Sequence, residues 1–284
     1  MVSLPPLHRL LYEPLLRRAL EEDLGRAGDL TSDSIAPPDL EVEASIVARS
    51  GGRVAGLQVA ADAFKLLDPG SVTELHCPDG VDAAPGQTVA LIRGKARAIL
   101  SVERTALNLL ARMCGIATTT RDVVAAIDGT AARVTCTRKT TPGLRLLEKY
   151  AVRAGGGFNH RFGLDDAVLI KDNHRALAGG VREAVERVRR QVGHLVKVEV
   201  EVDTLAELEE LLGLDVDAVL LDNMRVDLLK EAVAMVRGRL VTEASGGLTP
   251  DTAREVAATG VDLLSLGWLT HSVKALDVSL DLAV

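Results

Sequence analysis

The feature that most constrains the fold is an alternation of short apolar runs and longer amphipathic segments from about residue 130 onward. The runs have the length of buried strands, and the segments between them place their apolar residues at helical spacing. Consecutive strands joined by helices require right-handed crossovers, which build a parallel sheet. Because no dinucleotide-binding fingerprint is present, we expect a (β/α) barrel, of which the pattern locates six strands. The predicted strands cover residues 132–137, 167–171, 195–202, 218–222, 240–244 and 261–266, and the predicted helices cover about 175–191, 204–213, 225–237 and 249–259.

The first part of the chain has a different pattern, in which strands with one polar face are mixed with helices. We therefore predict an α/β protein with an N-terminal α+β sandwich domain over residues 1–114 and a catalytic α/β barrel over 115–270. The predicted N-terminal helices cover residues 7–24, 57–67 and 97–113, the predicted strands cover 40–49, 71–77 and 87–92, and 21–33 is predicted to be an acidic loop.

Composition excludes several classes of function. Of the 284 residues 47% are hydrophobic, but only 2% are aromatic, which argues against base-stacking platforms for nucleic acid, as does the net charge of −7. Cys77, Cys114 and Cys136 are odd in number and lack CxxC spacing, so we expect reduced, buried thiols. No apolar run reaches the roughly 18 residues of a membrane span, and the N-terminus does not read as a signal peptide. We expect a soluble, cytoplasmic protein.

Residues 137–174 are unusually basic for this acidic chain. They contain seven Lys or Arg against four acids, together with a triple glycine at 155–157. A local excess of cations in an acidic protein favours an anionic small molecule as partner. Glycines allow the backbone to approach such a ligand closely.

Polar and glycine residues also recur where the predicted barrel strands end. The carboxyl ends of barrel strands meet at one face, which is where functional groups gather in such folds. The residues at these ends are Arg138 and Lys139 after the first strand, Lys171 on the second, Glu201 on the third, Asp222 on the fourth, Ser245, Gly246 and Gly247 after the fifth, and Gly267 after the sixth.

Several short motifs carry a resemblance to a known family. TRKTTPGLR, KYAVRAGGGFNHRFGL and AVLIKDNH lie at the centre, SVERTALNLL and GIAT precede them, and EVEVDT, LLDN, EASGGL and GWLTHS follow. With these motifs in this order the chain resembles quinolinate phosphoribosyltransferase (carboxylating nicotinate-nucleotide pyrophosphorylase) from about Gly28 almost to its end. So many motifs in register are far more specific than a single glycine pattern.

The resemblance implies an activity and a set of partners. The activity is phosphoribosyl transfer from phosphoribosyl pyrophosphate to quinolinate with decarboxylation, which gives nicotinate mononucleotide, pyrophosphate and CO₂ in NAD biosynthesis. The family places the arginine of SVERT in the active site of a neighbouring subunit, so we expect a homodimer or a larger assembly. The family's barrel has seven strands, one more than the pattern locates, so we expect six to seven. The family also folds the tail, residues 271–284, back onto the first domain.

The implied substrates are anions, and the charged residues suit them. Guanidinium groups bind carboxylates bidentately, and each charged hydrogen bond contributes roughly 1.5–3 kcal/mol. The resemblance assigns quinolinate to Arg104, Arg138, His160, Arg161 and Lys171, with Lys139 and Lys171 also toward the pyrophosphate.

A second group of residues suits magnesium and phosphate. Residues 197, 199, 201 and 203 alternate with valines, so their charged side chains share one face of a strand, where they need partners or a metal. Glu201 and Asp222 resemble the family's acids around Mg²⁺ and the ribose hydroxyls. The turn Ser245–Gly247 before a helix is a phosphate cradle, which Gly267 and His271 would close.

Other interpretations remain open. A paralogous phosphoribosyltransferase associated with molybdate uptake shares the fold, a Schiff-base aldolase could use Lys171, and a phosphosugar-binding module would need only the Ser245 loop. Cys136 replaces an aspartate common in relatives and is interpreted as a small buried residue. Arg145, Lys149 and Arg153 are interpreted as an exposed helix face outside the site.

Overall fold

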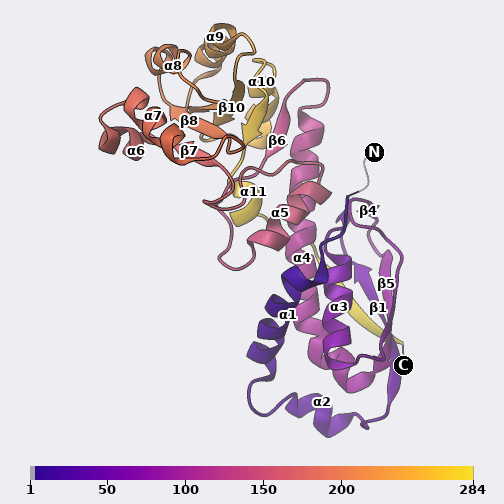
Figure 1. Cartoon of the computed structure of the whole chain (residues 1–284). Coiled ribbons are helices and arrows are strands. Elements are labelled where there is room, and N and C mark those ends of the chain that lie inside the picture. The colour runs from indigo at the N-terminus through magenta and orange to yellow at the C-terminus, as the bar shows by residue number, and fades with distance from the viewer. Residues whose placement is uncertain (1–3, 284) are drawn as a thin grey trace. The chain divides into compact units, whose positions relative to one another are not determined.

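A computed structural model describes residues 4–283 of the chain (Figure 1). It divides into two compact units. Unit one comprises Met1–Arg121, Thr140–Gly156 and Leu269–Val284, and unit two comprises Asp122–Lys139 and Gly157–Trp268. The division passes through the long helix α4 (Ala96–Ala126). Among the described residues, no helix has the length and apolarity needed to cross a bilayer.

Unit one is built on a four-stranded antiparallel sheet in the order β12-β1-β5-β3. On the sheet face that helices cover, Ala44, Ile46 and Ile92 are almost fully buried. The elements of this unit are the helices α1 (Arg9–Leu24), α2 (Leu30–Ile35), α3 (Leu57–Leu67) and α5 (Arg145–Ala154) with the first part of α4, and the strands β1 (Glu41–Ala48), β2 (Gly52–Arg53), β3 (Val72–Leu75), β4 (Asp82–Ala83), β5 (Thr88–Lys95) and β12 (Val278–Ala283).

The C-terminal tail completes this sheet. Strand β12 pairs with β1 in antiparallel register, from Glu43 opposite Ala283 to Ala48 opposite Val278. The segment before β12 crosses α4 so closely that a Cβ at Gly115 would lie 2.3 Å from the carbonyl oxygen of Lys274. Glycine is therefore required at this point of the helix.

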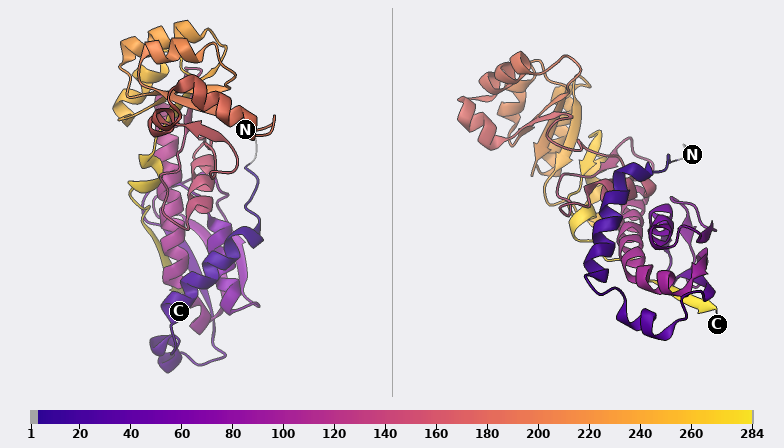
Figure 2. Two further views of the ribbon diagram at one scale, coloured as in Figure 1. Left: turned by 60° about the vertical axis from the view of Figure 1, so that its left-hand side comes forward. Right: turned by 60° about the horizontal axis from the view of Figure 1, so that its bottom comes forward.

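Unit two is built on a six-stranded parallel sheet in the order β6-β11-β10-β9-β8-β7. Its helices lie on the outer side of the sheet in the views of Figures 1 and 2. The strands are β6 (Arg133–Thr135), β7 (Val168–Ile170), β8 (Val198–Val202), β9 (Ala218–Asp222), β10 (Val241–Ser245) and β11 (Leu263–Ser265), and the helices are α6 (Asp172–Ala178), α7 (Val181–Gln191), α8 (Leu205–Leu211), α9 (Val226–Val236) and α10 (Pro250–Ala257), followed by the short α11 (Trp268–His271) at the boundary with unit one.

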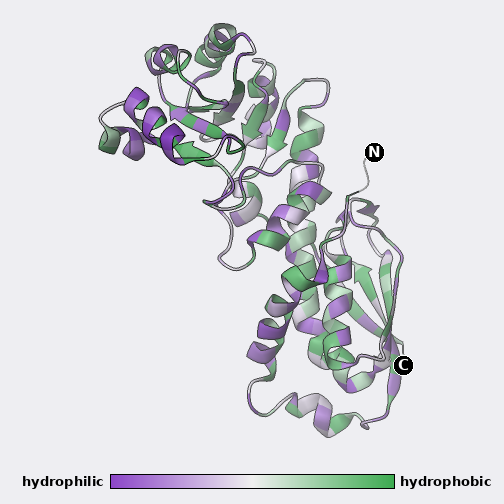
Figure 3. Cartoon of the chain, viewed as in Figure 1, coloured by the Kyte–Doolittle hydropathy of each residue, from purple (hydrophilic) through white to green (hydrophobic). Residues whose placement is uncertain are grey.

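The two faces of this sheet carry different kinds of side chain. In β8, Val198, Val200 and Val202 are fully buried beneath the helices, while Glu199 and Glu201 alternate onto the interior face. The hydropathy colours show a largely polar α7 on the outside of this unit (Figure 3). The predicted α/β fold with a parallel sheet of six strands is confirmed.

A further strand of the sheet is reduced to a single bridge. Thr135 of β6 forms a parallel bridge with Phe158. The Phe158 N–H donates to Val134 at 2.8 Å, and the Cys136 N–H donates to the Phe158 carbonyl at 3.2 Å. The segment around Phe158 therefore occupies the place of a strand without the length of one.

Four local predictions are wrong. The acidic loop 21–33 contains the start of a helix, because Asp29 caps α2 by accepting hydrogen bonds from the backbone N–H groups of Thr31 and Ser32. The helix predicted over 175–191 is two helices, α6 and α7, separated by Gly179 and Gly180, both with positive φ.

The third wrong prediction concerns the helix face of Lys149. Only 1% of this residue is exposed, whereas the spacing argument placed it on a solvated face. Residues 147–152 are all buried, so this turn of α5 has no solvent side. Likewise Lys197 and Asp203 are exposed, so only Glu199 and Glu201 of the four charged residues around β8 are interior.

Candidate active site

A cavity of about 360 Å³ lies at the carboxyl ends of the parallel strands of unit two. This is where the crossover topology gathers side chains from loops that are far apart in the sequence. Its lining consists of Thr137, Arg138, Lys139, His160, Arg161, Leu169, Lys171, Glu201, Leu220, Asp222, Ser245 and Ser265.

Two guanidinium groups in the lining lie close enough to influence each other. Burial first, and then the neighbouring charge of Arg138, lower the pKa of Arg161 from its usual value. Arg161 Nη1 donates to the Ala167 carbonyl at 3.2 Å, while its buried Nε has no hydrogen-bond partner among the described residues. Two like charges in one cavity repel, and an anion bound between them would relieve that repulsion.

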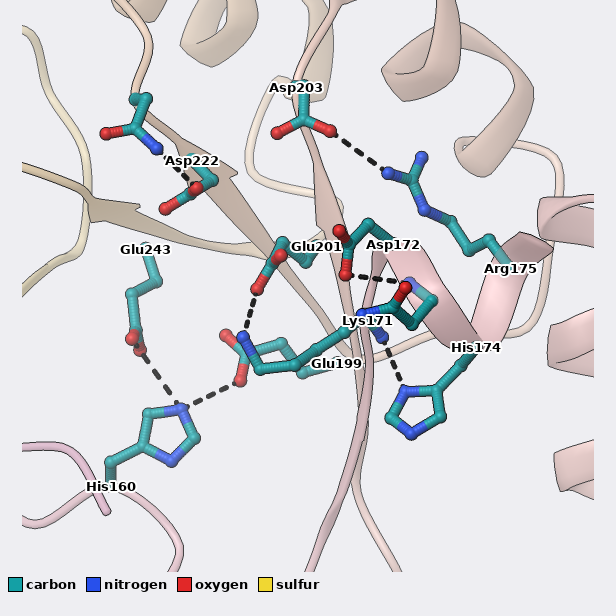
Figure 4. Close-up of polar contacts among 12 residues, drawn as sticks. His160, Lys171, Asp172, His174, Arg175, Glu199, Glu201, Asp203, Asp222 and Glu243 are labelled. Carbon is teal, nitrogen blue, oxygen red and sulfur yellow. Dashed lines mark hydrogen bonds and ion pairs between the residues drawn. The ribbon is translucent and has the colours of Figure 1, made fainter. Parts of the chain in front are cut away.

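An ion pair lines the same cavity. Lys171, which directly follows β7, donates from Nζ to Glu201 Oε2 of β8 at 2.6 Å (Figure 4). Glu201 is opposite Leu220 of β9, and Asp222 follows two residues later on the same face. The two carboxylates therefore come from adjacent strands and enter one cavity.

These two acids could bind a divalent cation together with oxygen atoms of a bound substrate. Magnesium prefers oxygen ligands and keeps several waters, so it needs few carboxylates when phosphate oxygens complete its shell. Asp222 also accepts a hydrogen bond from Asn223 Nδ2 at 2.6 Å, which orients its carboxylate.

A partly buried histidine lies between two further acids on the interior face. His160 Nε2 is 3.0 Å from Glu199 Oε2 and 3.6 Å from Glu243 Oε1 (Figure 4). Among residues 4–283, these three form the one group of His, Cys, Asp and Glu side chains close enough to share a metal ion. His160 Nδ1, however, accepts the backbone N–H of Arg161 at 2.7 Å, so the ring is already engaged within the chain.

The glycine turn after β10 has the geometry of an anion cradle. Gly246 and Gly247 both have positive φ, and α10 begins at Pro250 with Thr249 as its N-cap. A Cβ at Gly246 would lie 2.1 Å from Asn223 Oδ1, whereas one at Gly247 would meet nothing within 4 Å. Gly246 therefore packs against the loop after β9, and Gly247 faces open space where a phosphate could approach backbone N–H groups.

Comparisons with known proteins agree with this geometry. Residues 29–114 and 116–281 match the family models of the quinolinate phosphoribosyl transferase N-terminal and C-terminal domains. The chain belongs to the quinolinate phosphoribosyltransferase family. A probable carboxylating nicotinate-nucleotide pyrophosphorylase of Bacillus subtilis is 45% identical over 278 residues, covering 98% of this chain and 96% of that protein.

Further relatives give the same result. The carboxylating nicotinate-nucleotide pyrophosphorylase of Mycobacterium leprae is 43% identical, covering 94% of this chain and 95% of that protein. The crystal structure of NadC from Streptococcus pyogenes is 38% identical with a TM-score of 0.95, covering 98% of this chain and 99% of that chain. The resemblance inferred from the motifs is thus confirmed for the family and the fold.

The structure brings most of the predicted site residues of this quinolinate phosphoribosyltransferase family member together. Gly246 and Gly247 directly follow the lining residue Ser245, and Gly267 lies two residues beyond β11. Arg104 and His271 belong to unit one, so their part in the site stays a prediction. The lining contains these predicted residues: Arg138, Lys139, His160, Arg161, Lys171, Glu201, Asp222 and Ser245.

Four lining residues were missed by the sequence analysis. Thr137 and Ser265 lie at or just beyond the ends of β6 and β11, so their position at strand ends was a usable signal. Leu169 and Leu220 lie on the interior face among charged neighbours, and no polar signal marks them.

Proposed function

We propose that this chain transfers the phosphoribosyl group of phosphoribosyl pyrophosphate to quinolinate and decarboxylates the adduct, giving nicotinate mononucleotide, pyrophosphate and CO₂. The observation that carries the proposal is one cavity lined by Arg138, Lys139, Arg161 and Lys171 together with two acids, in a chain of this family. Both substrates are polyanions, so several cations in one place are what their joint binding requires.

Each part of the cavity has a proposed partner. Arg138 and Arg161 bind the quinolinate carboxylates, and Lys139 and Lys171 bind the pyrophosphate side. Ser245, Gly246 and Gly247, with Gly267, hold the ribose 5-phosphate through backbone N–H groups. Holding both substrates in contact converts an encounter of two anions into an intramolecular step.

The chemistry proceeds by displacement and then loss of CO₂. The bond between ribose C1 and the pyrophosphate oxygen breaks as the quinolinate nitrogen forms its bond to C1, and the departing oxygen takes the electron pair. Glu201 or Asp222 offsets the positive charge that develops on the ribose. The ring nitrogen of the adduct is cationic, so it accepts the electron pair of the bond to the 2-carboxylate, CO₂ leaves, and C2 takes a proton.

We further propose that Glu201 and Asp222 hold Mg²⁺, which when bound would neutralise the charge of the pyrophosphate leaving group. The support is that two carboxylates on adjacent strands enter a cavity that is also lined by Arg138, Lys139, Arg161 and Lys171. Removal of the ion with EDTA should abolish turnover, and added Mg²⁺ should restore it. Full activity in metal-free buffer would contradict this assignment.

One assay tests the whole reaction. Protein, Mg²⁺, quinolinate and phosphoribosyl pyrophosphate are mixed, and CO₂ and pyrophosphate should appear in equal amounts. Omission of quinolinate is the control, because hydrolysis of phosphoribosyl pyrophosphate alone would release pyrophosphate without CO₂. No CO₂ from carboxyl-labelled quinolinate would exclude the proposed function and favour a paralogous phosphoribosyltransferase.

A second subunit is proposed to complete the site. Arg104 of α4 is 69% exposed, and the nearest acid, Glu103, is 3.9 Å away, so its guanidinium is available to a neighbouring molecule. We expect Arg104→Ala and Arg138→Ala to be inactive separately, whereas mixed subunits should regain activity because some sites then have both arginines. No recovery in verified mixed assemblies would remove Arg104 from a shared site.

We propose a cytoplasmic location because the cysteines of this chain form no disulfide bonds. Cys77, Cys114 and Cys136 are all buried, and none of them forms a disulfide bond. Burial raises the pKa of Cys114 to about 12, which keeps this thiol protonated and unreactive at neutral pH. Cysteines without disulfide bonds suit a reducing compartment.

The alternative of a Schiff-base aldolase depends on Lys171. This lysine does lie at a barrel strand end, but it is paired with Glu201 at 2.6 Å. An ammonium group in an ion pair has no free electron pair with which to attack a carbonyl. Borohydride added with quinolinate and phosphoribosyl pyrophosphate should therefore trap no covalent adduct by mass spectrometry, and an adduct on Lys171 would favour the aldolase.

A further inference from the structure

The segment that carries Arg161 is fixed by its neighbour in the sequence. His160 Nδ1 accepts the backbone N–H of Arg161 at 2.7 Å, so this nitrogen carries no proton. The proton of the neutral ring is then on Nε2, which faces Glu199 Oε2 at 3.0 Å. The hydrogen bonds therefore select one tautomer of His160, as is usual for a histidine with a carboxylate partner.

A second carboxylate reinforces this arrangement. Glu243 Oε1 is 3.6 Å from the same Nε2, and its side chain is only 2% exposed, against 12% for both His160 and Glu199 (Figure 4). Glu201, on the same face of β8 as Glu199, is paired with Lys171.

Acids are unfavourable at these interior positions, and neighbouring positions of the sheet show the apolar residue that packing alone would favour. Glu199 is opposite Leu169 of β7, and Glu243 is opposite Leu220 of β9. Leucine thus occupies the neighbouring interior positions. A carboxylate in such a position is unfavourable unless it is paired, and here its partner is His160.

We infer that Glu199 and Glu243 are positioning residues that act through His160 on Arg161, an inference that rests on the proposed binding of quinolinate by Arg161. Glu199 accepts the Nε2–H of His160, the charge of Glu243 adds to this attraction from 3.6 Å, and the ring in turn holds the backbone of Arg161. Asp166 fixes the next turn by accepting the N–H groups of Phe162 and Gly163, the latter at 2.9 Å. The guanidinium of Arg161 is thereby aimed into the cavity before substrate arrives, which reduces the cost of ordering it on binding.

Each of two substitutions of His160 breaks one link of this relay. Asparagine can place an amide oxygen near the Nδ1 position but loses the contact with Glu199, whereas glutamine can place an amide near the Nε2 position but loses the acceptor for the Arg161 N–H. Both His160→Asn and His160→Gln should therefore raise the KM for quinolinate about tenfold and leave the KM for phosphoribosyl pyrophosphate unchanged. An unchanged KM for quinolinate in either variant would overturn the inference.

Substitutions of Glu199 test the other end of the relay. Glu199→Gln keeps an oxygen acceptor for Nε2–H and should leave the KM for quinolinate within about threefold, while Glu199→Leu removes it and should raise that KM about tenfold. Glu186→Leu on the exposed face of α7 is the matched control and should change nothing. Equal KM values for Glu199→Leu and the wild type would overturn the inference.

Nitrogen NMR of the ¹⁵N-histidine-labelled protein provides a test that needs no variant to remain active. The resonances lost in His160→Asn should be those of an unprotonated Nδ1 and a protonated Nε2. A protonated Nδ1 would overturn the relay and leave the proposed function intact. By contrast, an unchanged KM for quinolinate in Arg161→Ala would refute the role proposed for Arg161 itself.

Discussion

Arg138→Ala should abolish formation of nicotinate mononucleotide, with kcat/KM lower by about a hundredfold or more. A bidentate guanidinium–carboxylate pair contains two charged hydrogen bonds, each of about 1.5–3 kcal/mol, and every 1.4 kcal/mol is a factor of ten. Arg138 directly precedes Lys139 at the end of the first barrel strand, and both line the cavity with Arg161. Loss of Arg138 removes this binding energy and leaves a quinolinate carboxylate without its partner.

The matched control is Arg133→Ala at the opposite end of the same strand. Arg133 is exposed, stacks over the ring of Phe158 at 4.8 Å, and is not part of the cavity lining. Its loss should cost about 0.5–1 kcal/mol of stability, as expected for an exposed cation–π pair, and leave kcat/KM within about twofold. Both variants should keep the circular dichroism spectrum of the wild type. Unchanged turnover in Arg138→Ala would remove this arginine from the site.

The sequence allowed the parallel sheet to be predicted because its apolar runs have both the right length and the right spacing. Strand β9 begins and ends where it was predicted, since Ala218–Leu221 is a continuous apolar run bounded by aspartates. The segment around Phe158 escaped prediction because a single backbone bridge leaves no alternation of side chains. Helix breaks such as that at Gly179–Gly180 depend on paired positive φ values, which spacing alone does not reveal.

Exposure was harder to predict than secondary structure. Helix α1 forms where expected, but its Leu10 and Leu11 are 75% and 61% exposed, while Tyr12 and Leu16 are buried. Apolar spacing identifies a helix, whereas the face that packs depends on neighbours from distant parts of the chain. The same limit explains the buried Lys149.

Most of the candidate site could be predicted, because its polar residues directly follow the apolar runs that identify the strands. Arg138, Lys171 and Asp222 each lie beside a strand that the apolar pattern already located. The contact of His160 with Glu199 and Glu243 could not be predicted, because it joins three segments whose meeting depends on strand order and register. Alternation showed that Glu199 shares a face with Glu201, but not what it would contact.

Glu201→Gln should lower kcat by about a hundred- to a thousandfold, the range for loss of one preorganised electrostatic group in an active site. Glutamine has nearly the same shape, so the cavity should be unchanged, but the charge that faces the developing positive ribose is lost. The substitution also leaves Lys171 without its 2.6 Å ionic partner. Because Glu201 acts on the transition state, KM for quinolinate should change far less than kcat, and single-turnover kinetics should show that chemistry is the slowed step.

Asp203→Asn is the matched control for this variant. Asp203 is two residues further along the same face, but its side chain is 51% exposed and pairs with Arg175 at 3.1 Å, and it is not part of the cavity lining. Removal of its charge should leave kcat within about twofold, since Arg175 keeps its ion pair with Glu207 and neither residue lines the cavity. If both variants lost activity equally, a general effect of charge at the end of β8 would explain the loss. If neither did, Asp222 alone would have to offset the ribose charge, and the double variant Glu201→Gln/Asp222→Asn would show whether either acid does.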